Sequence, residues 1–177
     1  MTVWYKPRPA ALVEATPWLS KRATAILASY ISPEMQVIEF GAGGSTLWLA
    51  ERVKQVVSYE PNFEWYDVLV KKTPHNTRMV NDVFCHELPE FKADLLFIDG
   101  EPVEWRGRWL AIAPQLVKPG GVIVLDNANR PEYVCERFEL LKQCEPLECV
   151  NGNQDSSLFF VTEFYKLKGW HNGHHPG

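Results

Sequence analysis

Several signatures of common protein classes are missing from this chain of 177 residues. It contains four cysteines, at positions 85, 135, 144 and 149, and no CxxC pair. We therefore expect free thiols in a reducing compartment, the cytoplasm, and no zinc site. No apolar run approaches the length of a membrane span, and the N-terminus lacks the apolar core of a signal peptide. These absences predict a protein without a membrane partner.

A basic surface is also missing, because the formal net charge is −4. Without an excess of positive charge, general binding to nucleic acid is disfavoured. The content of 46% apolar and 23% charged residues is typical of a globular protein. We expect one domain over residues 1–177, with an N-terminal segment and helix in 1–32 and a flexible tail in 166–177. The tail carries His171, His174 and His175, and we interpret it as mobile rather than metal-binding.

The stretch VIEFGAGGST, residues 37–46, is the most informative in the chain. An apolar run typical of a buried parallel strand leads into Gly41, Gly43 and Gly44. Ser45 and Thr46 can then cap a helix. Glycines at such a turn let a ligand lie against the backbone. The order of strand, glycine turn and helix start therefore predicts a cofactor site.

Strands and helices alternate through the rest of the chain, which predicts a parallel sheet built from βαβ units. We expect further strands at 55–59, 77–80, 93–98 and 122–125, and helices at 20–31, 45–53, 65–72, through Leu110 to Leu116, and from Pro131 onward. The last helix should turn Val134, Phe138 and Leu141 inward. Two final runs, 147–150 and 158–165, read as an antiparallel pair added to the sheet.

Polar or glycine-rich clusters follow each of the first five expected strands. Ligands of open parallel sheets bind beyond the carboxyl ends of the strands. Acidic residues at so many strand ends therefore predict one site along one edge of the sheet. The clusters are 39–44, 60–62, 81–82, 99–100 and 126–127.

Four motifs together make the chain similar to the class I S-adenosylmethionine (SAM)-dependent methyltransferases over nearly its whole length. They are VIEFGAGGST, VVSYEPN, ADLLFIDG and LVKPGGVIVLDN, in the order and spacing of that family. The chain looks closest to a branch with a GxGGST turn, an IDG strand end, an arginine-led helix and a DNxxRPEY strand end. The resemblance implies a Rossmann-like, doubly wound α/β sheet of seven strands, mostly parallel, with the last strand antiparallel.

The resemblance also implies a set of cofactor-binding residues. Gly41 and Gly43 would lie against the methionine part of SAM, with Glu39 holding the turn, and Glu60 would accept hydrogen bonds from both ribose hydroxyls. Asp82 and Val83 would contact the adenine, and Asp99 would face the methionine amino group or the sulfonium. The full expected set is Glu39, Gly41, Ala42, Gly43, Ser45, Thr46, Glu60, Pro61, Asn62, Asp82, Val83, Asp99 and Gly100.

The residues that bind the methyl acceptor are harder to predict from the sequence, because methyl transfer from SAM needs positioning more than a dedicated catalytic group. The candidate catalytic residues are Asp99, Arg106, Asp126 and Asn127. Arg106 and Arg130 could clamp an acidic acceptor, or they could form ion pairs with Glu101, Glu104 or Glu132. The chain lacks the (D/N)PPY-type stretch of amino-methylating DNA enzymes and the Pro-Cys dipeptide of cytosine C5 enzymes. We expect a small-molecule acceptor, acidic or hydroxyl-bearing, with a protein side chain second.

Magnesium is an alternative at the same edge. Asp99, Asp126 and Asn127 resemble the Asp…Asp-Asn set of magnesium-dependent catechol-type O-methyltransferases, and three oxygen ligands suit Mg²⁺. Those enzymes usually have a longer helical region before the first strand, and two nearby arginines would disfavour a dication. We therefore do not favour a metal.

Two other functions stay open. The chain could be a SAM-binding protein, or S-adenosylhomocysteine-binding protein, that lacks catalysis or serves as a subunit of a larger enzyme. It could also be an NAD-dependent oxidoreductase, because a glycine turn followed by Glu60 suits a dinucleotide. Against this, Thr46 stands where the third glycine of GxGxxG would be. The oligomeric state cannot be read from the chain.

Overall fold

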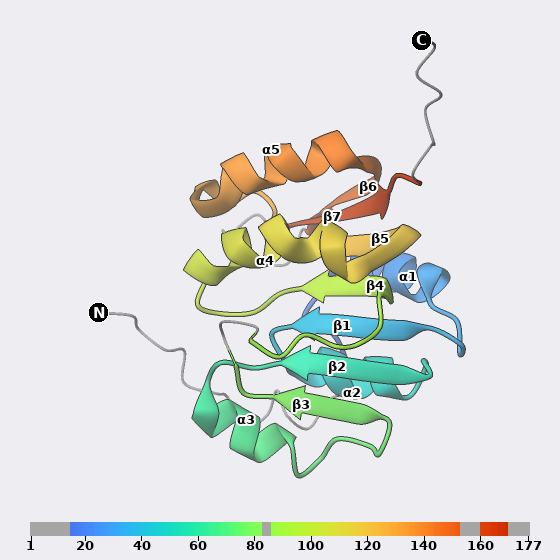
Figure 1. Cartoon of the computed structure of the whole chain (residues 1–177), viewed down its shortest axis with the longest axis vertical. Coiled ribbons are helices and arrows are strands. Elements are labelled where there is room, and N and C mark those ends of the chain that lie inside the picture. Colours follow the sequence, from blue (N-terminus) through green and yellow to red (C-terminus); the bar gives the residue numbers. More distant parts are fainter. Residues whose placement is uncertain (1–14, 83–85, 153–159, 170–177) are drawn as a thin grey trace.

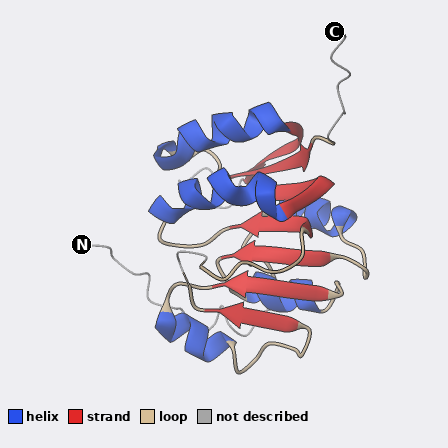
Figure 2. Ribbon diagram, in the orientation of Figure 1, coloured by secondary structure: helices blue, strands red, loops and turns tan. Residues whose placement is uncertain are grey.

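The structure, a computed structural model, describes residues 15–82, 86–152 and 160–169. A single sheet lies between two layers of helices (Figures 1 and 2). The elements in chain order are α1 (Lys21–Tyr30), β1 (Gln36–Phe40), α2 (Gly44–Ala50), β2 (Gln55–Tyr59), α3 (Phe63–Leu69), β3 (Thr77–Val80), β4 (Ala93–Ile98), α4 (Glu104–Leu116), β5 (Val117–Leu125), the short 3₁₀ helix η2 (Pro131–Tyr133), α5 (Val134–Gln143), β6 (Cys144–Gly152) and β7 (Phe160–Leu167).

The sheet has seven strands in the order β3-β2-β1-β4-β5-β7-β6. Strands β1 to β5 run parallel to one another, and β7 runs antiparallel to both β5 and β6. The strand order reverses between β1 and β4, which is where open α/β sheets bind ligands. This arrangement confirms the Rossmann-like fold, with its antiparallel last strand, that the sequence predicts.

Apolar residues on both faces of the central strands produce two cores. On one face, Ile38 and Leu96 pack under α4, whose Trp109 and Leu110 are buried. On the other face, Val37 and neighbouring side chains pack against α1 and α2. Figure 1 shows α4 and α5 covering one face of the sheet and α1 and α2 behind it. Burial on both faces explains why β1, β4 and β5 read as continuous apolar runs.

The parallel register brings the strand ends together. Phe40 pairs with Tyr59 and with Ile98, and Ile98 pairs with Leu125. The ladder continues one residue further, because the Asp99 amide donates to Phe40 and the Asp126 amide to Ile98, at 2.9 and 3.0 Å. The residues that follow four strands therefore form one row: Gly41, Glu60, Asp99 and Asp126.

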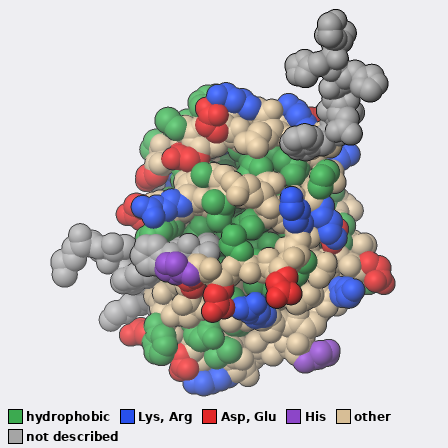
Figure 3. All heavy atoms as spheres, viewed as in Figure 1, with side chains coloured by type: hydrophobic (Ala, Val, Ile, Leu, Met, Phe, Trp, Pro, Cys, Tyr) green, Lys and Arg blue, Asp and Glu red, His purple; other side chains and the backbone are tan. Residues whose placement is uncertain are grey.

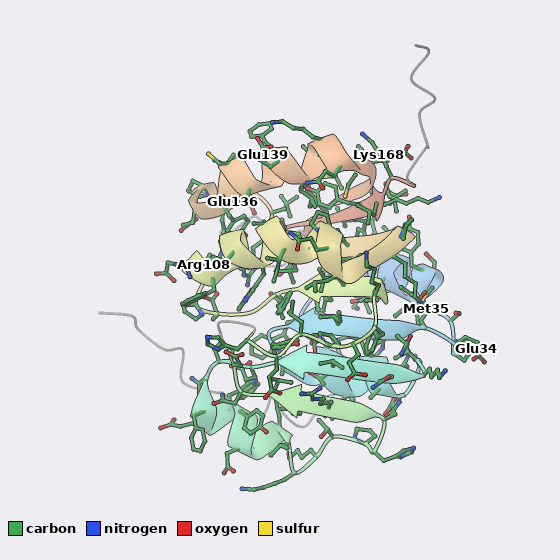
Figure 4. The ribbon with its side chains drawn as sticks, viewed as in Figure 1. Glu34, Met35, Arg108, Glu136, Glu139 and Lys168 are labelled. Carbon is green, nitrogen blue, oxygen red and sulfur yellow. The ribbon has the colours of Figure 1, made fainter. Side chains whose placement is uncertain are left out.

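Figure 4 marks the two ends of the sheet. Glu34 and Met35 lie where β1 begins, whereas Arg108 and Glu136 lie at the opposite end, where the strands finish. The row of polar strand ends belongs to that second end. The expected gathering of acidic residues along one edge is therefore present.

Several expected boundaries differ from the structure. β5 begins at Val117, because Val117 pairs with Ala93 ahead of a register shift, and Gly120 turns there with φ of 81°. β7 continues to Leu167, so the first two residues of the expected tail, 166 and 167, belong to the sheet. The histidines of that tail lie outside the described residues. In α3, Val68 is exposed and Leu69 supplies the buried contact.

The inward face of α5 was predicted correctly only in part. Leu141 packs against the core as expected, but Val134 and Phe138 are exposed, and Leu140 is buried. The buried stripe also includes Tyr133 and Arg137, and Arg137 pairs with Glu163 on β7. This partly buried ion pair in the middle of the stripe interrupts the apolar period that the prediction followed.

No helix in the described residues is long and apolar enough to cross a membrane.

A matched pair of substitutions tests this assignment of α5. Leu140→Ala should lower the free energy of unfolding by about 2–5 kcal/mol, because it removes a fully buried side chain. Phe138→Ala should change it by less than about 1 kcal/mol, since most of that ring is exposed. Urea denaturation of both variants makes the comparison. A larger loss of unfolding free energy for Phe138→Ala than for Leu140→Ala would support the inward face that the sequence predicted.

Candidate functional site

A pocket opens at the carboxyl ends of β1, β2 and β4. Its space between protein atoms is about 740 Å³, part of it open to solvent. Its lining residues come from the glycine turn, from the ends of two further strands and from the segment before α1. They are Trp18, Gly41, Ala42, Gly43, Gly44, Ser45, Glu60, Asn62, Trp65, Asp99, Gly100 and Glu101.

Glu39 holds the glycine turn from below. Its carboxylate is fully buried and accepts hydrogen bonds from Ser45 at 2.5 Å, Thr46 at 2.6 Å and Ser58 at 2.5 Å. Two of these donors belong to α2, so the carboxylate ties the start of that helix to β1. Burial raises the pKa of Glu39 to about 7, and the three hydroxyl donors limit the rise.

The glycines of the turn have different reasons to be glycine. Gly41 has a φ of 100°, and a Cβ there would lie 2.1 Å from the Cα of Gly100. Close approach of the two backbones therefore requires Gly41. Gly43 has an extended φ of −176°, and a Cβ there would meet no atom within 4 Å. No contact in the described protein requires a glycine at this position, and the residue lines the pocket.

Glu60 follows β2 in the pocket wall, beside the glycine turn, and is 6% exposed. Its two oxygens accept from the backbone amides of Ala42 at 3.1 Å and Asn62 at 2.8 Å. Each oxygen keeps a further lone pair. Burial raises the pKa of Glu60 to about 8, against the effect of both amides. Trp65 closes this side, with its indole N–H donating to the Ala42 carbonyl.

Asp99 and Asp126 form a pair of carboxyl groups at the ends of β4 and β5. Asp99 lines the pocket, and Asp126 lies behind it, accepting from Thr162 at 2.8 Å and from the Asn127 side chain at 2.9 Å. Burial, and then the charge of Asp126, holds the pKa of Asp99 well above its usual range. Burial also raises the pKa of Asp126. The negative charge of Asp126 thus opposes the ionisation of Asp99.

Arg106 fastens β4 to β5. The side chain is 1% exposed, and it donates to the carbonyls of Gly100, Asp126 and Asp99 at 2.7–2.8 Å. It also pairs with the Asp99 carboxylate at 3.1 Å. Every nitrogen of the guanidinium therefore has a partner within the protein. These contacts favour ion pairing and positioning over the acceptor clamp, which stays a hypothesis.

The proposed magnesium ligands are arranged unfavourably for a cation. Asp99 faces Arg106, and the Asn127 side-chain oxygen also faces it at 3.3 Å. Both oxygens of Asp126 already accept hydrogen bonds. A dication here would meet a buried guanidinium. Within 15–82, 86–152 and 160–169, no group of three or more His, Cys, Asp or Glu side chains could hold a metal. The residues present do not fit Mg²⁺.

Eight of the thirteen expected cofactor-binding residues line the pocket, and four of the other five do not. Glu39 and Thr46 lie beneath the turn and Pro61 lies outside the lining. The carboxylate of Asp82 accepts from the His86 amide at 2.5 Å. Val83 lies outside the described residues. Of the expected catalytic residues, Asp99 lines the pocket, while Arg106, Asp126 and Asn127 are buried behind it.

Four lining residues were absent from the expected set. Gly44 already lies within the first strand-end cluster, 39–44, and Glu101 directly follows the cluster 99–100, so extending that cluster by one position would have found it. Trp65 has the helical spacing of a core residue, and no motif marks it as a pocket residue. Trp18 lies at the pocket with its side chain largely exposed.

Glu39 should make the stability depend on pH. Its pKa is about 7 in the folded protein and 4.5 ordinarily, so the folded state binds the proton more tightly. Its contribution is therefore fully present below about pH 4.5 and is lost as the pH rises through 7, by up to about 3 kcal/mol. Denaturation from pH 5 to 8 measures the slope. Glu39→Gln should flatten it, and an unchanged slope in that variant would contradict the assignment.

Arg106→Met should lower the free energy of unfolding by about 3–5 kcal/mol, because three carbonyls and a buried carboxylate lose their donor. Arg108→Met is the matched control, two residues along the same helix, since Arg108 is exposed and lies over the Trp105 ring. The control should lose less than about 1 kcal/mol in the same denaturation experiment. Equal losses would show that Arg106 is not a structural link.

Comparisons with known proteins agree with this geometry. Residues 38–128 match the family described as "Methyltransferase domain". No curated protein matches the chain. The N-methyltransferase NodS from Bradyrhizobium japonicum WM9 has a similar structure, with a TM-score of 0.67, 16% identity, and coverage of 84% of this chain and 95% of that one. A complex of NodS with S-adenosylhomocysteine aligns with a TM-score of 0.63 and 15% identity, over 89% and 95% of the two chains.

Two further solved structures have other acceptors in their names. The tRNA (m1A58) methyltransferase TrmI from Aquifex aeolicus aligns with a TM-score of 0.62 and 18% identity, over 93% of this chain and 78% of that one. The 1,6-didemethyltoxoflavin-N1-methyltransferase from Burkholderia thailandensis aligns with a TM-score of 0.63 and 18% identity, over 84% of this chain and 77% of that one. At these identities the similarities show the fold. The family match spans 91 of the 177 residues, from β1 to just beyond β5, and the chain therefore belongs to the methyltransferase-domain family.

Proposed function

We propose that this protein is a SAM-dependent methyltransferase that binds SAM in the pocket at the carboxyl ends of β1, β2 and β4. The acceptor under this proposal is a small molecule. When bound, SAM supplies a methyl group on a positively charged sulfur. The residues of the chain bind the cofactor, fix its orientation and present the acceptor to it.

Gly43 is the observation that carries the proposal. Neither its backbone angle nor any described neighbour requires a glycine, and the residue lines the pocket. A glycine that the fold itself does not require, at the wall of a pocket, supports close approach of a ligand to the backbone of the turn. Gly41 next to it is explained by the fold alone, so the two positions can be separated by experiment.

Glu60 fits the ribose of SAM. Each of its oxygens accepts one backbone amide and keeps capacity for one hydroxyl of a vicinal diol. Asn62 and Trp65 border the same part of the pocket. These residues support binding of the adenosine half of SAM at the end of β2. The methionine half would then lie at the end of β4.

NAD fits less well than SAM. The third glycine of a dinucleotide turn allows the helix to pack closely on its strand. Thr46 occupies that position, is fully buried and donates to Glu39. A glycine at position 46 would lack this hydroxyl, and the Glu39 carboxylate would lose one of its hydrogen-bond donors.

The distribution of charge supports a small acceptor over nucleic acid. Lys and Arg side chains are scattered among Asp and Glu on the face in Figure 3 and do not gather in one basic patch. The structurally similar proteins differ in their named acceptors, a tRNA in one and a toxoflavin precursor in another. The acceptor must therefore be inferred from the pocket itself.

Isothermal titration with SAM, S-adenosylhomocysteine and NAD tests the proposal. SAM and S-adenosylhomocysteine should bind, and NAD should not. Glu60→Gln should weaken S-adenosylhomocysteine by about 10- to 100-fold, the range for hydrogen bonds to a charged group. Affinity of the parent should rise with pH up to about 8, because binding favours the ionised Glu60 carboxylate over the protonated form. Glu60→Gln should lose that dependence.

Two controls make the result specific. Glu64→Gln removes the same charge from an exposed position in the first turn of α3, outside the pocket, and should bind normally. Gly43→Ala should keep the stability of the parent and lose affinity, whereas Gly41→Ala should destabilise the fold. NAD binding without SAM binding would overturn the proposal, as would full affinity in both Glu60→Gln and Gly43→Ala.

A further inference from the structure

The charged side chains that line the pocket all have one sign. Glu60, Asp99 and Glu101 are acidic, and no lysine, arginine or histidine is among the lining residues that the structure describes. A cavity lined by one sign of charge attracts ligands of the other sign. The pocket is therefore suited to a positively charged molecule.

These carboxyl groups divide between two parts of the pocket. Glu60 faces the glycine turn and is bonded to its backbone through Ala42. Glu101 follows β4, and its side chain is 47% exposed. Trp18 also lines the pocket, with 57% of its surface exposed. An open indole and a carboxylate at one pocket are the two groups that recognise organic cations.

The nearby arginines do not reverse this charge. Arg106 is buried and directs its donors to backbone carbonyls. Arg130 and Arg106 form ion pairs with one oxygen of Glu101, Oε1, at 3.6 and 3.8 Å, both longer than a hydrogen bond. Neither arginine lines the pocket. An acidic acceptor would therefore meet carboxylates on the pocket wall, with both arginines already paired to Glu101.

We infer that the methyl acceptor is an amine, bound as its ammonium ion between Glu101 and the Trp18 ring. This inference rests on the proposed function and names the substrate class of the same site. It replaces the acidic acceptor that Arg106 and Arg130 suggested in the sequence. Glu101 supplies the attraction, and the indole supplies an aromatic face for the charge or for the groups that carry it, while Asp99 is left to the methionine half of SAM.

Transfer to an amine balances in charge and atoms. The ammonium first loses one proton through the half-exposed Glu101 carboxylate to solvent. The nitrogen lone pair then forms a bond to the methyl carbon as the carbon–sulfur bond breaks. The electrons of that bond stay on sulfur, which becomes a neutral thioether, and the nitrogen takes the positive charge.

Three probes that share one ring separate the acceptor classes: benzylamine, benzyl alcohol and benzoate. Each is titrated, in 0.15 M salt at pH 7, into the protein saturated with S-adenosylhomocysteine, so that no turnover occurs. Ligand-observed NMR measures the affinities. Benzylamine should bind at least tenfold more tightly than benzoate or benzyl alcohol. Glu101→Gln and Trp18→Ala should each weaken benzylamine several-fold.

Glu139→Gln is the matched control, because it removes an equal charge from an exposed side chain of α5 outside the pocket (Figure 4). It should leave benzylamine binding unchanged. Equal or tighter binding of benzoate or benzyl alcohol would overturn the inference, as would unchanged benzylamine affinity in Glu101→Gln. Failure of S-adenosylhomocysteine to bind would instead overturn the proposed function, and this inference with it.

Discussion

Hydrogen bonds between parallel strands continue one residue past the strand ends and place Gly41, Asp99 and Asp126 side by side. The rest of the site depends on this register. A slip of one residue would turn every side chain of a strand to the other face. The cores on both faces oppose such a slip, because each central strand buries apolar side chains on both of its faces. Packing far from the pocket therefore fixes the order of groups within it.

Burial of carboxyl groups at this edge has an electrostatic cost. The pKa values of Glu39, Glu60, Asp99 and Asp126 are all raised, and burial is the largest cause in each case. Hydroxyl and amide donors offset part of that cost for Glu39 and Glu60. A ligand that brings hydroxyl donors or positive charge would offset more. The site therefore suits a molecule that brings both, which agrees with SAM and with a cationic acceptor.

The fold was predictable from the sequence because its signals are local. Strand ranges at 55–59, 77–80 and 93–98 are the observed ones, since glycine, proline or polar residues bound each apolar run. The face of α5 was not predictable from periodicity, because Arg137 occupies an inward position and its partner Glu163 is 26 residues away. Pairings between distant residues carry no local pattern.

Arg106 shows the same limit within the site. An arginine that opens the helix after β4 could reach the pocket or turn beneath it, and the sequence does not distinguish the two. The structure turns it beneath, where it joins the carbonyls of Asp99, Gly100 and Asp126. Asp99 is thereby fixed by the sheet and by one buried guanidinium, so its place in the pocket does not depend on the conformation of a loop. The guanidinium of Arg106 therefore binds the ends of β4 and β5 and does not line the pocket. This leaves acidic side chains in the part of the pocket where we expect the acceptor.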